Sequence, residues 1–336
     1  MSSEGAGVPT RSGAVGAELG VRRWDWRRLA APASLVVALV AILVAGGVTT
    51  PEFLTVDNVL IVVRAASITG IVALGMTFVT LTGNFFSLSV EQTAAMCSII
   101  FAEGLAHGYG LAVSLVLALV ASIGIGLGQG LVVAAGLNPI VTTLGAGAAL
   151  YGLAAVVTHN EVVNFTTTEA DWLGRGRPLG IPTQSWAFVI FTILATLVLV
   201  RTRFGRQVYL VGANRRAAGA SGLSVGKTTA IAFTLSALAA GIAGVFTAAQ
   251  ITQAPLTQFA GLNFDVIAAV LVGGTALQGG EGSTLRSALG AVFIALLANF
   301  LLLRDTTFGI RTLVTGLIVV VATAAFHLLR TRGRRL

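Results

Sequence analysis

Two stretches of this sequence carry residue types that could do chemistry, and the first is close to a loop that binds phosphate. Residues Ser221–Thr228 read Ser-Gly-Leu-Ser-Val-Gly-Lys-Thr, so they end like a phosphate-binding loop but have serine in place of its first glycine. Such a loop binds phosphate where a strand leads into it and a helix follows it. Here a basic segment leads in and an apolar segment follows. We therefore expect Lys227 to be a charged anchor beside a membrane span, and we expect no ATP site in this chain.

The second stretch is a polar interruption between two apolar runs. It reads Gly-Asn-Phe-Phe-Ser-Leu-Ser-Val-Glu over residues 83–91. Breaks of this kind in transporters occur where membrane helices are discontinuous and contact the solute. We name Asn84, Ser87, Ser89 and Glu91 as candidate lining of a solute pathway, with simple packing between helices as the alternative.

Four more ionisable residues lie within apolar segments. They are Arg64, Glu103, Asp265 and Arg311. A charge at mid-membrane costs about 2.5–3.5 kcal/mol on insertion scales, so such residues usually face the bundle interior or a pathway. Glu103 and Arg311 are close to the ends of their segments, where a long side chain can reach the interface. For Arg64, both a functional role and an interfacial one stay open.

Other residue types exclude catalytic and metal chemistry. The three histidines, His107, His159 and His327, are far apart and match no metal-ligand spacing. Cys97 is the single cysteine, so no disulfide can form within the chain. No Gly-x-Ser-x-Gly or HExxH motif is present. The sequence predicts no catalytic residue, no metal site and no cofactor bound by this chain.

The composition places most of the chain in lipid. Of 336 residues, 55% are hydrophobic and only 10% are charged, and the mean hydropathy is +0.90. A soluble domain has about 25% charged residues. The net charge of +8 would suit nucleic acid on a soluble protein, but these basic residues gather at the ends of apolar segments. The positive-inside rule explains them, and we expect a lipid bilayer, not nucleic acid, as the partner.

Spans of about 20 apolar residues predict an all-α, polytopic transmembrane helical bundle. Ten segments qualify or nearly qualify, at residues 29–48, 59–82, 88–108, 110–135, 139–157, 185–201, 229–251, 265–277, 284–303 and 308–328. The segment 265–277 is too short to cross alone, so we expect a half-helix or re-entrant element shielded by its neighbours. The first segment lacks a convincing cleavage site, and we interpret it as a retained span.

The arrangement of Lys and Arg predicts the topology. The N-terminal tail 1–28, the loop 201–228 and the C-terminal tail 329–336 are all rich in arginine, which places them in the cytoplasm with both termini. The polar loop 158–184 falls on the external side. Residues 29–328 then form a single transmembrane domain.

A short helix is predicted within the basic loop. Its alanine-rich stretch starts at Asn214, which can cap a helix, and stops at Ser221 and Gly222. The small residues Ala217 and Ala218 suit a helix that docks into a groove of a partner. The alternative is a solvated linker.

Several motifs, in this order and spacing, resemble the ABC-importer permeases of the ribose, xylose and galactose type, which are related to branched-chain amino-acid permeases. The resemblance runs from about Thr50 to Phe326. The motifs are the stretches 70–77, 81–83, 138–145, 180–182, 202–206, 212–214 and 267–275, followed by Gly279, Gly280 and Gly282.

The resemblance implies an assembly in the bacterial inner membrane. Two permease subunits, identical or not, would work with two cytoplasmic subunits that bind ATP and with an external solute-binding protein. The helix near Asn214–Gly222 would couple to the ATPase, and Gly273, Gly274 and Thr275 would join the pathway lining. The expected solute is a monosaccharide. Two alternatives stay open: a non-sugar solute such as a branched-chain amino acid, and an ion-coupled secondary transporter with Glu91 as its essential acid.

The sequence departs from the family pattern at two places. The usual Gly-Gly-Ile-Asp-Leu-Ser-Val-Gly is replaced by residues 83–91, where the aspartate is missing and Glu91 occupies a glycine position. An acidic residue of the coupling helix is replaced around Arg215-Arg216. The first departure leaves the solute open. The second predicts matching acidic residues on the ATPase, or a heterodimer with a more typical permease.

Overall fold

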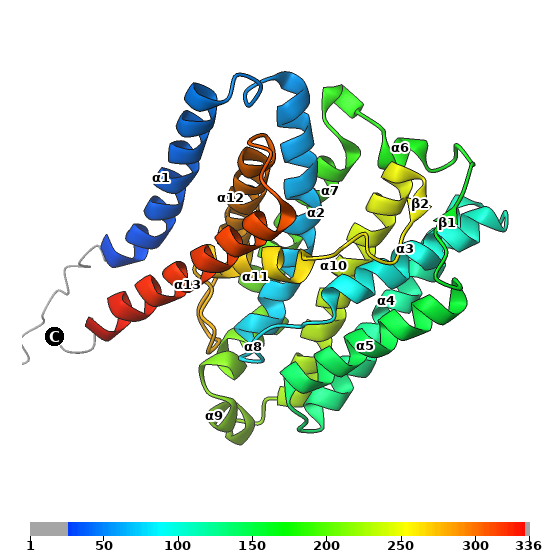
Figure 1. The fold of residues 1–336 in the computed structure, drawn as a ribbon. Coiled ribbons are helices and arrows are strands. Elements are labelled where there is room, and N and C mark those ends of the chain that lie inside the picture. Colours follow the sequence, from blue (N-terminus) through cyan, green and yellow to red (C-terminus); the bar gives the residue numbers. More distant parts are fainter. Residues whose placement is uncertain (1–25, 333–336) are drawn as a thin grey trace, which may run out of the picture.

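The computed structural model describes residues 26–332 and is a bundle of helices (Figure 1). Of the predicted tails, residues 1–25 and 333–336 lie outside this range, while 26–28 belong to the first helix and 329–332 to the last. The helices are α1 (Trp26–Thr49), α2 (Val56–Leu81), α3 (Val90–Ala106), α4 (Gly110–Ala134), α5 (Pro139–Val157), α6 (Asp171–Gly174), η1 (Pro178–Gly180), α7 (Thr183–Arg201), α8 (Arg203–Ala213), α9 (Arg215–Ala220), α10 (Val225–Ile251), α11 (Leu262–Val272), α12 (Thr284–Leu302) and α13 (Phe308–Arg332).

The all-α prediction is confirmed, and each of the ten predicted segments overlaps one of these helices. Within the described range, six helices are long and apolar enough to cross a membrane: α2, α4, α5, α7, α10 and α12. The number of spans stays a prediction, because α3 has 17 residues and α11 has only 11.

Local sequence sets several helix boundaries. Helix α5 starts after Asn138, whose side-chain oxygen accepts a hydrogen bond from the Ile140 amide at 2.9 Å, and Pro139 occupies the first helical position. This is the favoured start of a helix, because the cap satisfies a free amide and proline has none to satisfy.

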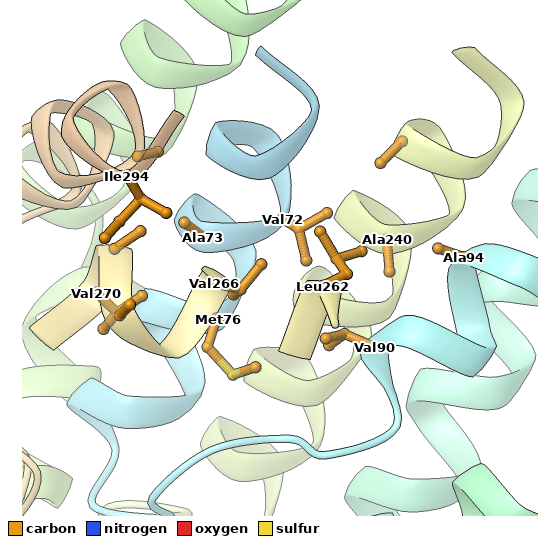
Figure 2. Packing of buried hydrophobic residues seen from close by; sticks show 14 of the residues in the cluster. Val72, Ala73, Met76, Val90, Ala94, Ala240, Leu262, Val266, Val270 and Ile294 are labelled. Carbon is orange, nitrogen blue, oxygen red and sulfur yellow. The ribbon is translucent and has the colours of Figure 1, made fainter. Parts of the chain in front are cut away.

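The centre of the bundle is α10, which packs against α2, α3 and α4. Small residues allow this. A Cβ at Gly244 would overlap the Ala94 carbonyl oxygen of α3, so the two backbones touch directly. Figure 2 shows the adjoining core, where Val72 and Met76 of α2 lie against Leu262 and Val266 of α11.

Two elements differ from the prediction. The basic loop 201–228 contains a second helix, α8, which was not predicted. Val208 and Val211 are buried on one face of α8, and their three-residue spacing is the sequence signal for this helix. The half-helix covers Leu262–Val272 instead of 265–277. It ends early because Gly274 has φ +77, a conformation that leaves the helix.

The loop 158–184 also holds an unpredicted strand. Strand β1 (Val163–Asn164) pairs antiparallel with β2 (Gln253–Ala254), which follows α10. The pair ties this loop to the end of the central helix. In Figure 1 it lies at the opposite end of α10 from α8 and α9.

Candidate functional site

A cavity of about 360 Å³ lies between α2, the end of α10 and the segment that leads into α11. Its volume is in the range of pockets that hold small molecules. The polar part of its lining consists of Arg64, Thr69, Thr247, Gln250, Gln258 and Asp265. The remaining lining is mostly apolar, including Ile68 and Phe259.

Four of the polar side chains in this cavity have no partner. The side chains of Arg64, Gln250, Gln258 and Asp265 make no hydrogen bond or salt bridge with any residue that the structure describes. The Arg64 Nε atom is buried despite this. Gln258 is exposed and the other three side chains are half-buried, so water reaches this site, and the four groups are available to a polar solute that replaces the water.

The chain is built to bring these side chains together. Helix α10 ends at Ile251, where Thr252 adopts φ +55, and strand β2 follows at once. The chain then turns back so that Gly261, with φ +88, begins α11. Gln250 therefore lines the same cavity as Gln258 and Asp265, and Arg64 reaches it from the third turn of α2.

None of the residues predicted to line a pathway lies in this cavity. Two of them, Ser87 and Ser89, are buried and bonded to each other at 3.1 Å. Ser89 also donates to Gln129 Oε1 of α4 at 2.8 Å. The Gln129 Nε2 atom is buried without a partner. In this conformation the serines connect α3 to α4, and their role in a pathway stays a prediction.

Glu91 links the start of α3 to the start of α11. Its Oε2 accepts a hydrogen bond from the Gly261 amide at 3.2 Å, and its own amide donates to Asn263 Oδ1 at 3.4 Å. Asn263 in turn donates to the Leu88 carbonyl at 3.0 Å. A carboxylate at the N-termini of two helices is favourable, since both ends carry partial positive charge. Gly261 lies between two cavity-lining residues, so Glu91 supports the cavity from behind its wall.

The glycine motif after α11 serves close packing. A Cβ at Gly273 would lie 2.7 Å from the Arg286 carbonyl oxygen of α12, which is too close for any side chain. Gly274 provides the left-handed turn, and Thr275 is buried with its hydroxyl 3.4 Å from that of Ser287. These three predicted lining residues hold α11 against α12, apart from the cavity.

Asn84 lies at the other end of α2, and its side chain is fully buried. Its Oδ1 accepts a hydrogen bond from the Arg215 guanidinium of α9 at 2.7 Å. A second guanidinium nitrogen donates to Thr229 Oγ1 of α10 at 3.3 Å. Partial burial lowers the pKa of Arg215, but arginine stays charged at neutral pH, so these are charge-assisted bonds.

The short helix α9 lies where the sequence predicted a helix. The Asn214 side chain caps it by accepting from the Ala217 amide at 3.0 Å, and Gly222 ends it with φ +79. Asn214, Ala217, Ser221 and Gly222 are exposed, whereas Ala218 is buried within the chain itself. Of the two alanines, only Ala217 presents its surface outward.

The remaining ionisable candidates are not among the residues that line the cavity. Glu103 pairs with His107 one turn later at 3.2 Å, near the end of α3. Arg311 is half-buried in α13 and is near enough to the cavity residue Asp265 for a favourable electrostatic interaction without a salt bridge. Sequence reasoning found Arg64 and Asp265 as charges within apolar segments, but it missed Gln250 and Gln258. Their signal was weak, because an amide near a helix end is common and carries no spacing rule.

The sequence of this chain is similar to those of known transport proteins. A family model described as "Branched-chain amino acid transport system / permease component" matches residues 58–323. The ribose import permease protein RbsC of Escherichia coli (strain K12) is 33% identical over 292 residues, which cover 85% of this chain and 91% of that protein. RbsC of Bacillus subtilis is 30% identical and covers 86% and 88%.

A third relative imports a different molecule. The autoinducer 2 import system permease protein LsrC of Salmonella paratyphi B is 29% identical, over 86% of this chain and 83% of that protein. No solved structure matches the chain. Because the family model and the relatives cover most of the sequence, the predicted resemblance is confirmed: the chain belongs to the family of branched-chain amino acid transport system permease components.

Proposed function

We propose that this chain is the transmembrane permease subunit of a bacterial ABC importer for a monosaccharide. The support comes from relatives named as ribose import permeases, matched over most of their length, and from the cavity with its four unpaired polar side chains. The cavity is the observation that supports a solute site in this chain.

The chemistry of the cavity suits a polyhydroxylated solute. The amides of Gln250 and Gln258 can each donate to and accept from a hydroxyl group, the Asp265 carboxylate can accept from two, and Arg64 can only donate. Phe259 and Ile68 add apolar surface for the C–H face of a sugar ring. A sugar would thus satisfy groups that the chain leaves open.

Partners supply the energy and the specificity in this proposal. Cytoplasmic subunits bind and hydrolyse ATP, and an external binding protein delivers the solute. The chain would lie in the inner membrane with both termini in the cytoplasm. A second permease copy, identical or not, or lipid would cover the exposed apolar faces of α4, α5 and α7, whose apolar windows are only 17–22% buried.

The exposed face of α9 is the proposed contact with the ATPase. Asn214, Ala217, Ser221 and Gly222 are open to a partner, while Ala218 is packed inside the chain. We therefore assign docking to Ala217 and give Ala218 the task of seating α9 on the permease. Closure of the ATPase subunits would push α9 and rock the spans between two states.

The test is transport by the assembled complex in proteoliposomes, with the cognate ATPase inside and the binding protein outside. Radiolabelled ribose, xylose, galactose and leucine serve as substrates. We expect ATP-dependent accumulation of at least one sugar, and none without ATP. Accumulation by this chain alone under a proton or sodium gradient would show instead a secondary transporter and would reject the proposal.

A branched-chain amino acid is the second candidate solute. The observation in its favour is that the cavity holds one cation and one anion, Arg64 and Asp265, which could meet the carboxylate and ammonium groups of a zwitterion. Uptake of leucine without uptake of any sugar would select this solute and would leave the permease role intact.

A further inference from the structure

Arg215 connects the proposed ATPase-docking helix to two membrane helices. It is the first residue of α9, and its guanidinium reaches Asn84, just after α2, and Thr229 in α10. Both acceptors are fully buried. Asn84 also donates to Thr82 Oγ1 at 2.7 Å. We call Asn84, Arg215 and Thr229 the clasp.

Close backbone contacts hold the clasp in place. Gly212 is the second-to-last residue of α8. It lies so close to α2 that a Cβ there would overlap the Leu81 carbonyl oxygen. The Gly280 amide donates to that same oxygen at 2.9 Å, and a Cβ at Gly279 would lie 2.5 Å from the Gly83 nitrogen. Because no flexible side chains intervene, a shift of α8 and α9 must move the end of α2.

The clasp leads along the chain to the solute cavity. Asn84 begins the polar stretch 84–91, and at its other end Glu91 bonds to the Gly261 amide. Ala260 and Leu262 on either side of Gly261 line the cavity. The path from α9 to the cavity wall therefore consists of one charge-assisted contact, eight residues of continuous chain and one further hydrogen bond.

We propose that Arg215 is a positioning residue that transmits the displacement of α9 through Asn84 and the stretch 84–91 to the wall of the solute cavity. The inference rests on the proposed function, since it assigns α9 to the ATPase. The two stretches that depart from the family pattern, 83–91 and Arg215-Arg216, contact each other at this point. Where the resemblance leads us to expect acidic groups, this chain has an arginine–amide contact.

The test measures movement at the cavity without requiring a transported sugar. Gln258→Cys places a thiol in the cavity lining, and the native Cys97 is fully buried, so a maleimide in detergent solution labels the new thiol. We compare labelling rates of the permease–ATPase complex with and without a non-hydrolysable ATP analogue. With the clasp intact, the analogue should change the rate by about tenfold, as expected when a two-state equilibrium shifts.

Variants of the clasp then separate transmission from mere stability. Arg215→Met removes both contacts, and we expect the analogue to change labelling by less than about twofold, since loss of a bond to a charged group is worth about tenfold. Asn84→Asp keeps the contact as an ion pair and should retain the response. Arg216→Met is the matched control, because Arg216 is exposed on the same helix and its side chain makes no hydrogen bond or ion pair within the described chain.

A double variant distinguishes transmission of movement from simple stabilisation of the fold. In Arg215→Met with Asn84→Leu, made in a Thr229→Val background because the Thr229 hydroxyl is buried and bonds only to these two side chains, no polar side chain of the clasp is left unpaired, so a purely stabilising clasp would be repaired. We expect the complex to assemble and hydrolyse ATP while the labelling response stays lost. A restored response in the double variant, or a normal response in Arg215→Met, would overturn the proposal.

Sugar uptake by the chain with its native Gln258 and an intact clasp keeps the two proposals apart. If the labelling response follows the clasp but no sugar enters proteoliposomes, the solute assignment fails and the transmission role stands. If the chain binds no ATPase subunit at all, the proposed function fails and the transmission role fails with it.

Discussion

The cavity and the clasp lie at opposite ends of α2 and use polar side chains in opposite ways. At the cavity, Arg64, Gln250, Gln258 and Asp265 are left without partners. At the clasp, Asn84, Arg215 and Thr229 bond to one another. A polar group that the chain leaves unpaired is available to a ligand, whereas a buried one that is paired fixes the geometry of the elements that carry it.

The backbones differ in the same sense. Around the clasp, glycines bring main chains into direct contact, as Gly212 does against Leu81. Around the cavity, full side chains such as Phe259 and Ile68 separate the elements. The two ends therefore differ in compliance: the clasp end can transmit displacement, and the cavity end has room for a solute.

The largest effect is expected at the clasp end of α2, where main chains are in direct contact. Gly212→Ala adds a methyl group that overlaps the Leu81 carbonyl oxygen, and we expect a loss of roughly 3 kcal/mol or more in stability. Thermal unfolding in detergent with size-exclusion chromatography measures it. Gly219→Ala in α9 is the control, since a Cβ there meets nothing within 4 Å; equal stability of the two variants would contradict the rigid contact.

The next effect concerns the outer surface of α9, beyond the clasp. Ala217→Trp should reduce ATP-dependent uptake by about 100-fold, the equivalent of about 3 kcal/mol of overpacking at a docking interface, because Ala217 is exposed. The isolated permease should stay as stable as wild type. Ala218→Trp should instead destabilise the permease itself, since Ala218 is buried. The opposite pattern would reverse our assignment of the two alanines.

At the cavity, a single unpaired group should matter for affinity. Asp265→Asn should raise the KM for the transported solute about tenfold, because a hydrogen bond to a charged group is worth about 1.5–3 kcal/mol. Uptake kinetics at saturating binding protein measure it. Asp57→Asn is the matched control: Asp57 is exposed in the first turn of α2 and lies outside the cavity lining. An unchanged KM in Asp265→Asn would move the solute site elsewhere.

The smallest effect is expected at Glu91, which lies between the two regions. Glu91→Gln keeps one acceptor for the Gly261 amide, so we expect a loss of about 1 kcal/mol in stability and ATP-driven uptake within about twofold of wild type. Thermal unfolding and uptake assays check this. Complete loss of uptake with normal folding would favour the ion-coupled alternative, in which Glu91 carries the ion.

Local sequence is enough to predict where the chain meets lipid and where most helices lie. Low charge and apolar runs require membrane spans, because backbone groups in lipid must be satisfied within a helix. Local capping rules located α9 between Asn214 and Gly222. Both depend on residues close together along the chain, and so they can be read from one sequence. Helix α8 was missed because its arginines concealed the spacing of Val208 and Val211.

Which polar residues act together depends on contacts between helices far apart in the sequence. Arg215 meets Asn84 across 131 positions, and Glu91 meets Gly261 across 170. No periodicity links residues so far apart. From the sequence, Asn84 and Glu91 belong to one polar break and have the same predicted role. In the fold, Asn84 belongs to the clasp and Glu91 supports the cavity wall. The reason is physical: helix packing, not local pattern, determines which buried polar atoms find partners and which stay open to a solute.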